Sequence, residues 1–116
     1  MRPVDLETND ASGDEQVTSV CPLDTYIRPF QVTLKTIVTG TVEYTVEYTE
    51  DRVFDANFDP DAANWLPIFS NEEGGNMFAA TDNAEATLIS TVTGVRMRQT
   101  AGNGSVLLQI RQAGAV

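Results

Sequence analysis

Hydrophobic and polar residues alternate without a break over residues 41–49. Val42, Tyr44, Val46 and Tyr48 fall on one side of the chain, and threonines and glutamates fall on the other. A period of two, carried by β-branched and aromatic residues, predicts a β-strand with one buried face and one solvent-facing face. This pattern is typical of antiparallel sheets, whose outer surface can meet water.

Similar alternation recurs along the chain. Residues 30–38 and 41–49 are separated by Thr39-Gly40, which predicts an antiparallel hairpin, and a change of phase near Thr36 and Ile37 predicts a bulge in its first strand. A glycine-rich turn between residues 94–100 and 105–112 predicts a second hairpin. Shorter strands are expected within 16–20, 65–69, 77–80 and 84–92. With seven or eight short strands, the predicted fold is all-β, an antiparallel β-sandwich or jelly roll.

A chain of 116 residues is expected to form one domain. Residues 1–15 are polar, small and acidic, with no periodic apolar set, and are predicted to be a flexible N-terminal arm preceding a single β-sandwich domain over 16–116. Asp5, Glu7 and Asp10 are then candidate partner-binding residues. The alternative is a disordered terminus without a role.

The formal net charge is −10 and the pI is about 4.1. This balance argues against binding to nucleic acid or to an anionic membrane surface, because both need clustered Lys and Arg. It suits docking onto a basic protein surface. The sequence contains no run of 18 apolar residues, so no membrane span is predicted. The acidic N-terminus lacks the apolar region of a secretory signal peptide.

The charges are unevenly distributed. No acidic residue follows Glu85, whereas Arg96, Arg98 and Arg111 lie beyond it. In a homo-oligomer, this basic end of one subunit could meet the acidic flank of its neighbour. Alternatively, the arginines pair with acids on adjacent strands of the same subunit.

The sequence offers little catalytic chemistry. Histidine is absent, and the serines have no nucleophile elbow or adjacent base. Glu43 and Glu47 lie about 13 Å apart by strand rise and are interpreted as surface charge. The single cysteine, Cys21, is expected to be a buried apolar residue. We therefore expect no enzymatic activity and no cofactor.

An acidic loop raises the question of calcium. Its alternating oxygen ligands are Asp55, Asn57, Asp59 and Asp61. An EF-hand is excluded, because proline occupies the sixth position, where glycine is needed, and leucine occupies the twelfth, where glutamate is needed. A looser calcium site and a solvated acidic loop both stay open.

Aromatic residues gather in the same proline-interrupted region. They are Phe54, Phe58, Trp65 and Phe69. They could form a satellite core at one end of the sandwich, or anchor a loop that grips another protein. Carbohydrate binding by Trp65 is a third alternative.

Three segments carry a resemblance to a known class of proteins. They are Phe30–Val32 with Val38–Val46, the region around Trp65, and Thr93–Ile110, together about half of the chain. In these segments the chain resembles small β-rich virion structural proteins of tailed bacteriophages. The resemblance implies a capsid decoration or cement protein on the outside of the head, made in the host cytoplasm.

On this resemblance the partners would be the major capsid protein and copies of the chain itself, commonly as a homotrimer. No nucleic acid or membrane partner is expected. Partner-binding candidates are then the four aromatic residues, the three acids of the arm, and Arg96 and Arg98. The alternatives are a neck, tail or head-fibre component, or a carbohydrate-binding β-sandwich module.

Overall fold

The computed structural model describes residues 4–23, 31–53, 56–68, 77–88 and 92–112. Nine strands and no helix lie within these ranges, so no helix there is long and apolar enough to cross a membrane. The strands are β1 (Val4–Asn9), β2 (Gln16–Val17), β3 (Cys21–Pro22), β4 (Val32–Thr39), β5 (Glu43–Thr49), β6 (Leu66–Pro67), β7 (Ala84–Leu88), β8 (Gly94–Ala101) and β9 (Ser105–Gln112).

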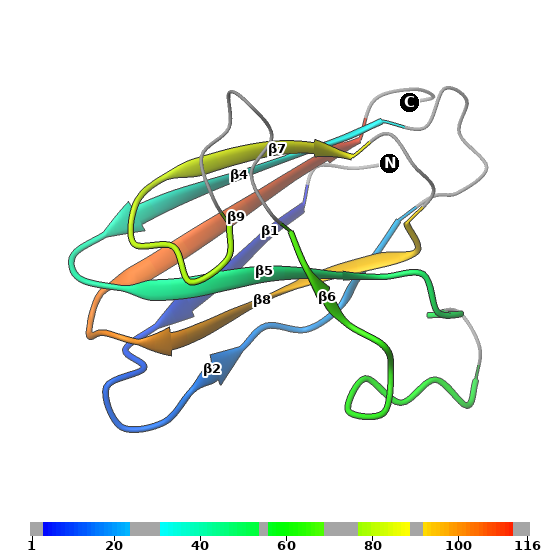
Figure 1. Cartoon of the computed structure of the whole chain (residues 1–116), viewed down its shortest axis with the longest axis horizontal. Helices are drawn as coiled ribbons and strands as arrows, with labels where there is room; N and C mark the ends of the chain where they lie inside the picture. The colour runs from blue at the N-terminus through cyan, green and yellow to red at the C-terminus, as the bar shows by residue number, and fades with distance from the viewer. Residues whose placement is uncertain (1–3, 24–30, 54–55, 69–76, 89–91, 113–116) are drawn as a thin grey trace.

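The strands form two antiparallel sheets that face each other, as a β-sandwich does (Figure 1). We call the sheet with strand order β1-β9-β4-β7 sheet A. Sheet B has the order β2-β8-β5-β6, and β3 also pairs with β8. The all-β prediction is confirmed.

One hydrophobic core lies between the sheets. It takes alternate residues of the long strands, such as Val32 and Leu34 of β4, Val46 of β5 and Leu108 of β9, all of which are fully buried. Alternation therefore identified the inner face of each long strand correctly, and Cys21 is buried as expected.

The two predicted hairpins are wrong. β4 pairs with β7 and β9, and β5 pairs with β6 and β8, so each predicted hairpin has one strand in each sheet. Both glycine-containing connections cross from one sheet to the other. A period of two reports which face of a strand is buried, but it does not report which strand lies alongside.

The predicted bulge near Thr36 and Ile37 is also wrong. β4 keeps an unbroken register with β9, and the one register shift between β5 and β8 falls at Glu43 and Tyr44. Thr36 stays on the buried face because its hydroxyl has partners there: Oγ1 is 2.5 Å from the Tyr44 hydroxyl and accepts from the Ala84 N–H at 2.9 Å. The contact with Tyr44 ties sheet B to sheet A, and the Tyr44 hydroxyl donates to the carbonyl of Asp82, just before β7, at 2.6 Å.

The two crossing connections pack backbone against backbone at one end of the sandwich. Gly102 has φ +95°, and a Cβ there would collide with the Thr41 carbonyl and lie 2.7 Å from Val42 Cα. The Ala11 N–H donates to the Gly102 carbonyl at 2.8 Å, so the chain after β1 also joins this end. Only a residue without a side chain fits such an approach.

The N-terminal region differs from the expected arm. Val4–Asn9 form β1, which pairs with β9 over all six residues, from Val4 opposite Ile110 to Asn9 opposite Ser105. Of the shorter predicted strands, 16–20, 65–69 and 84–92 contain β2, β6 and β7, whereas 77–80 contributes only a single bridge, between Ala80 and Tyr44.

Candidate functional site

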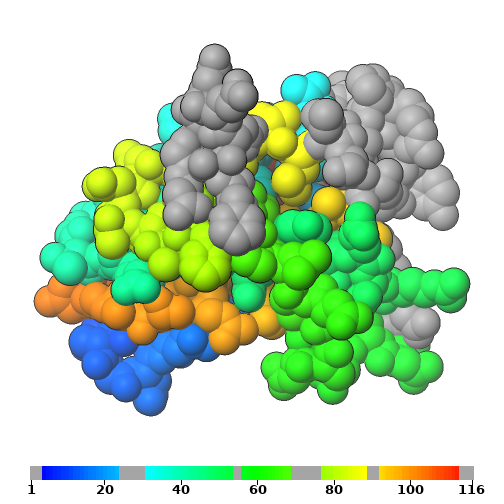
Figure 2. Space-filling model, viewed as in Figure 1, coloured from blue at the N-terminus to red at the C-terminus, as the bar shows by residue number. Residues whose placement is uncertain are grey.

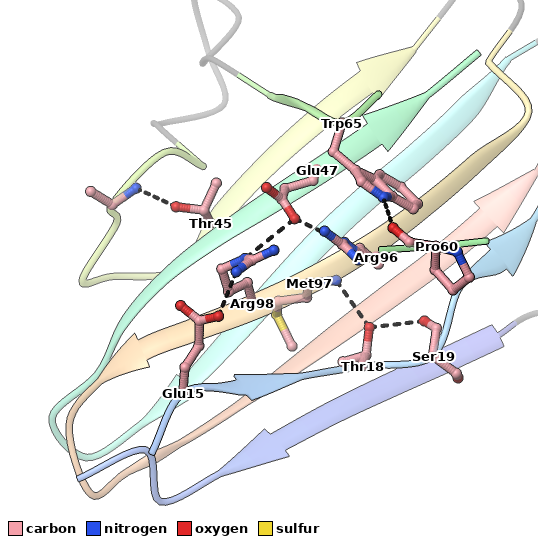
Figure 3. Close-up of polar contacts among 11 residues, drawn as sticks. Glu15, Thr18, Ser19, Thr45, Glu47, Pro60, Trp65, Arg96, Met97 and Arg98 are labelled. Carbon is pink, nitrogen blue, oxygen red and sulfur yellow. Dashed lines mark hydrogen bonds and ion pairs between the residues drawn. The ribbon is translucent and has the colours of Figure 1, made fainter. Parts of the chain in front are cut away.

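The outer face of sheet B carries a cluster of charged and aromatic side chains, which we call the arginine cluster: Glu15, Glu47, Trp65, Arg96 and Arg98 (Figure 3). Register places Glu47 of β5 directly opposite Arg96 of β8. The Arg96 Nε donates to Glu47 Oε1 at 2.9 Å, and the side chains are only 8% and 15% exposed.

Trp65 covers the other side of Arg96. The guanidinium carbon lies 4.2 Å from the centre of the indole ring, a cation–π arrangement. The indole Nε1–H donates to the Pro60 carbonyl at 2.8 Å, which fixes the ring (Figure 3). Trp65 therefore fastens the end of the 56–65 loop to sheet B, and one face of its ring is used within the molecule.

Arg98 completes the cluster. The Arg98 Nε lies 3.5 Å from Glu47 Oε1, so Glu47 faces two arginines. The Arg98 Nη1 pairs with the carboxylate of Glu15. Glu15 lies in the segment before β2, so this ion pair holds the connection between the two sheets against β8. Glu47 lies on the outer face, as expected for a surface charge, but its side chain is paired and only 15% exposed, whereas Glu43 is exposed.

The uneven charge distribution is resolved within the subunit. Arg111 of β9 pairs with Asp5 of β1 at 3.0 Å, alongside the pairs that Arg96 and Arg98 make. Of the two alternatives for the basic C-terminal strands, the structure adopts pairing with adjacent strands of the same subunit.

The acidic loop forms a lobe that projects from the body of the molecule (residues 56–68, green in Figure 2). A shallow hollow of about 260 Å³ lies here, lined by Asp51, Arg52, Asn57, Phe58, Asp59, Ala62 and Ala63. Asp51 accepts from the Asn64 backbone N–H at 2.7 Å, and Asp59 accepts from the Asp61 N–H at 3.0 Å. These carboxylates shape the loop.

Two of the four aromatic candidates lie within the described residues. Phe58 is half-buried and lines the hollow, Trp65 stacks on Arg96, and Phe54 and Phe69 lie outside the described residues, as does Asp55 of the acidic loop. Within the described ranges, no group of three or more Cys, Asp or Glu side chains is placed to hold a metal ion.

The acidic candidates of the N-terminal region lie on or next to β1. Asp5 and Glu7 are exposed on the outer face of sheet A. Asp10 follows the strand with φ +54°, and its carboxylate accepts from the Ser12 hydroxyl at 2.5 Å and from the Ser12 N–H at 3.2 Å. These hydrogen bonds hold the pKa of Asp10 below its usual value.

Two buried groups have raised pKa values. Burial raises the pKa of the Cys21 thiol to about 11 and disfavours the thiolate at neutral pH. Burial also raises the pKa of the Tyr44 phenol, partly offset by its hydrogen bond to Thr36. Neither group is poised for nucleophilic chemistry.

The sequence analysis missed Glu15 and Glu47 as the partners of the two candidate arginines. The signal that could have found Glu47 is that 41–49 carries acids and 94–100 carries arginines on the polar face of strands of similar length. It was missed because 41–49 was predicted to pair with 30–38, whereas β5 pairs with β8. No protein-family model matches the chain, and no curated protein matches it significantly.

Proposed function

We propose that the protein is a non-enzymatic virion structural protein of a tailed bacteriophage. It binds the outside of the major capsid shell as a decoration or cement protein, acts as a homotrimer, and stabilises the head. This role follows the resemblance in three segments of the sequence, and the arrangement of charges on the sandwich supports it.

The supporting observation is the internal use of the arginines. Arg96, Arg98 and Arg111 are paired inside the subunit, while many acids of the described residues stay exposed: Glu7, Asp14, Glu43, Glu50, Asp59, Asp61, Asp82 and Glu85. The exterior is therefore acidic on several faces, and its complement is a basic protein surface. Buried Cys21 and Tyr44 pack in the core and add no reactive group to that exterior.

A particle assay tests the proposal. The copy number per virion is measured by quantitative gel staining of purified particles, and the purified protein is then added back to particles stripped of it. We expect hundreds of copies, and rebinding that weakens as salt screens the acidic surface. A dozen copies or fewer would indicate a neck, tail or fibre component instead.

The hollow beside Phe58 favours a second candidate, a carbohydrate-binding module. An aromatic ring flanked by carboxylates, an amide and a guanidinium is a surface suited to a small hydroxylated ligand. Titration of the labelled protein with free hexoses tests this function. Amide shifts confined to residues 51–63 would support it, and unchanged spectra at high millimolar sugar would remove it.

A further inference from the structure

The four sheet edges within the described residues differ in how well they are protected from pairing with another strand. In sheet B, the edge strands β2, β3 and β6 have two residues each, and β3 and β6 contain Pro22 and Pro67. Short strands and prolines make poor edges for strand addition. β1 of sheet A, by contrast, runs for six residues without proline and in unbroken register with β9. It is the longest edge of the four.

Charge distinguishes β1 from β7, the opposite edge of sheet A. Glu85 of β7 lies across from Lys35 of β4, so a basic neighbour is already present in the sheet. Glu7 of β1 lies across from Leu107 of β9, and it makes no ion pair with any residue that the structure describes. Asp5, two residues earlier on the same face, is paired with Arg111. Glu7 is therefore the acid on an open edge that lacks a cation.

A second copy of the chain fits this edge poorly. Antiparallel pairing of two β1 strands about Leu6 would place Asp5 of one copy opposite Glu7 of the other. Like charges directly opposite each other destabilise a strand pair. Pairing β1 with β7 of another copy would place Glu85 of that copy near Asp5 and Glu7, which is again a repulsion between like charges. The acids thus disfavour self-association and favour a strand of opposite charge.

We propose that the free edge of β1 binds an extended, basic segment of a partner protein by strand addition. Main-chain hydrogen bonds would extend sheet A by one strand, and a Lys or Arg of the segment would lie opposite Glu7 on the outer face. Apolar residues between the basic ones would lie on the inner face, beside half-buried Leu6. This inference rests on the proposed function and names the chemistry of the partner segment.

The test uses the full-length, isotope-labelled protein and a capped eight-residue peptide that alternates lysine and valine. We expect amide chemical-shift changes and slowed hydrogen exchange concentrated in Val4–Asn9. The variant Glu7→Lys should bind about tenfold more weakly, because it replaces an attractive cross-strand pair by a repulsive one. Glu85→Lys is the matched control, since it makes the same charge change on the opposite edge, and its affinity should stay within about twofold of wild type.

A second peptide separates strand addition from charge attraction alone. N-methylation of the alternate residues whose N–H groups would face β1 removes those donors and keeps the charge of the peptide, so its binding should be lost. Equal binding of the methylated peptide, equal weakening by Glu7→Lys and Glu85→Lys, or no binding at millimolar peptide would each overturn the inference. Dimerisation of the free protein through β1, seen by light scattering and mapped by the same shifts, would overturn it as well.

Failure of this inference can be told apart from failure of the proposed function. If hundreds of copies occupy each particle and Glu7→Lys rebinds stripped particles like wild type, the shell is bound elsewhere on the surface. If copy number is a dozen or fewer, the decoration role itself fails, whatever the peptide does.

Discussion

Replacing Tyr44 by phenylalanine removes one oxygen atom from the contact between the two sheets. The hydroxyl lies 2.5 Å from Thr36 Oγ1 and 2.6 Å from the Asp82 carbonyl oxygen, and Tyr44 is fully buried. A hydrogen bond contributes about 1 kcal/mol net, and an acceptor left buried without a partner costs about 1–3 kcal/mol. Thr36 keeps its contacts with Ala84. We therefore expect a loss of about 2–3 kcal/mol in the free energy of unfolding.

Urea denaturation followed by circular dichroism measures this loss. For a chain of 116 residues, about 1 kcal/mol lowers the melting temperature by roughly 4 °C, so Tyr44→Phe should melt about 8–12 °C lower. A double-mutant cycle with Thr36→Val isolates the pair and should give a coupling energy of about 1 kcal/mol.

Tyr48→Phe is the matched control, because Tyr48 lies on the same strand and is only half-buried. Its hydroxyl makes no hydrogen bond with the described residues, so we expect a change within about 0.5 kcal/mol. If Tyr44→Phe also changes stability by less than about 0.5 kcal/mol, the hydroxyl does not tie the sheets together and the reasoning is refuted.

Three further predictions concern Gly102 in the connection between β8 and β9, the Cys21 thiol, and Trp65. Gly102→Ala should cost about 2–5 kcal/mol, from a left-handed backbone and the clash with Thr41, whereas Gly13→Ala, with nothing within 4 Å, should be neutral in the same urea titration. Because burial raises the pKa of Cys21 to about 11 from an ordinary 9.0, its stabilising contribution is complete below pH 9.0 and is lost as the pH rises towards 11. Between pH 9.0 and 11, Cys21→Ala should therefore lose less free energy of unfolding than the wild type. An equal dependence of that free energy on pH in the two proteins would contradict the prediction. Trp65→Ala should weaken particle attachment more than it destabilises the isolated protein; a loss of several kcal/mol in the isolated protein would make Trp65 a core residue.

Alternation along the sequence was sufficient to find the long strands and their buried faces. Val32 and Leu34, Tyr44 and Val46, and Val106 and Leu108 all point into the core because a strand with one wet face must carry its apolar residues at every second position. Cys21 is buried as well, as expected for a lone cysteine between Val20 and Pro22. Alternation failed at Thr36, because a threonine on the inner face reads as a change of phase until its hydrogen-bond partners from distant segments are known.

The candidate site depended on strand neighbours, which the sequence did not reveal. Glu47 and Arg96 are 49 residues apart, and their ion pair exists because β5 lies beside β8 instead of forming a hairpin with β4. Likewise, the acids at the N-terminus read as a solvated tail, yet Val4–Asn9 become an edge strand because β9 offers six residues of pairing.

Local side-chain periodicity is a property of the chain itself, and it determined the fold class and the buried apolar positions of the long strands. Pairing between strands is set by packing across the whole molecule, including backbone contacts such as those of Gly102 with the Thr41 connection. Only the tertiary structure therefore decided which charges neutralise one another and which acidic edge stays open.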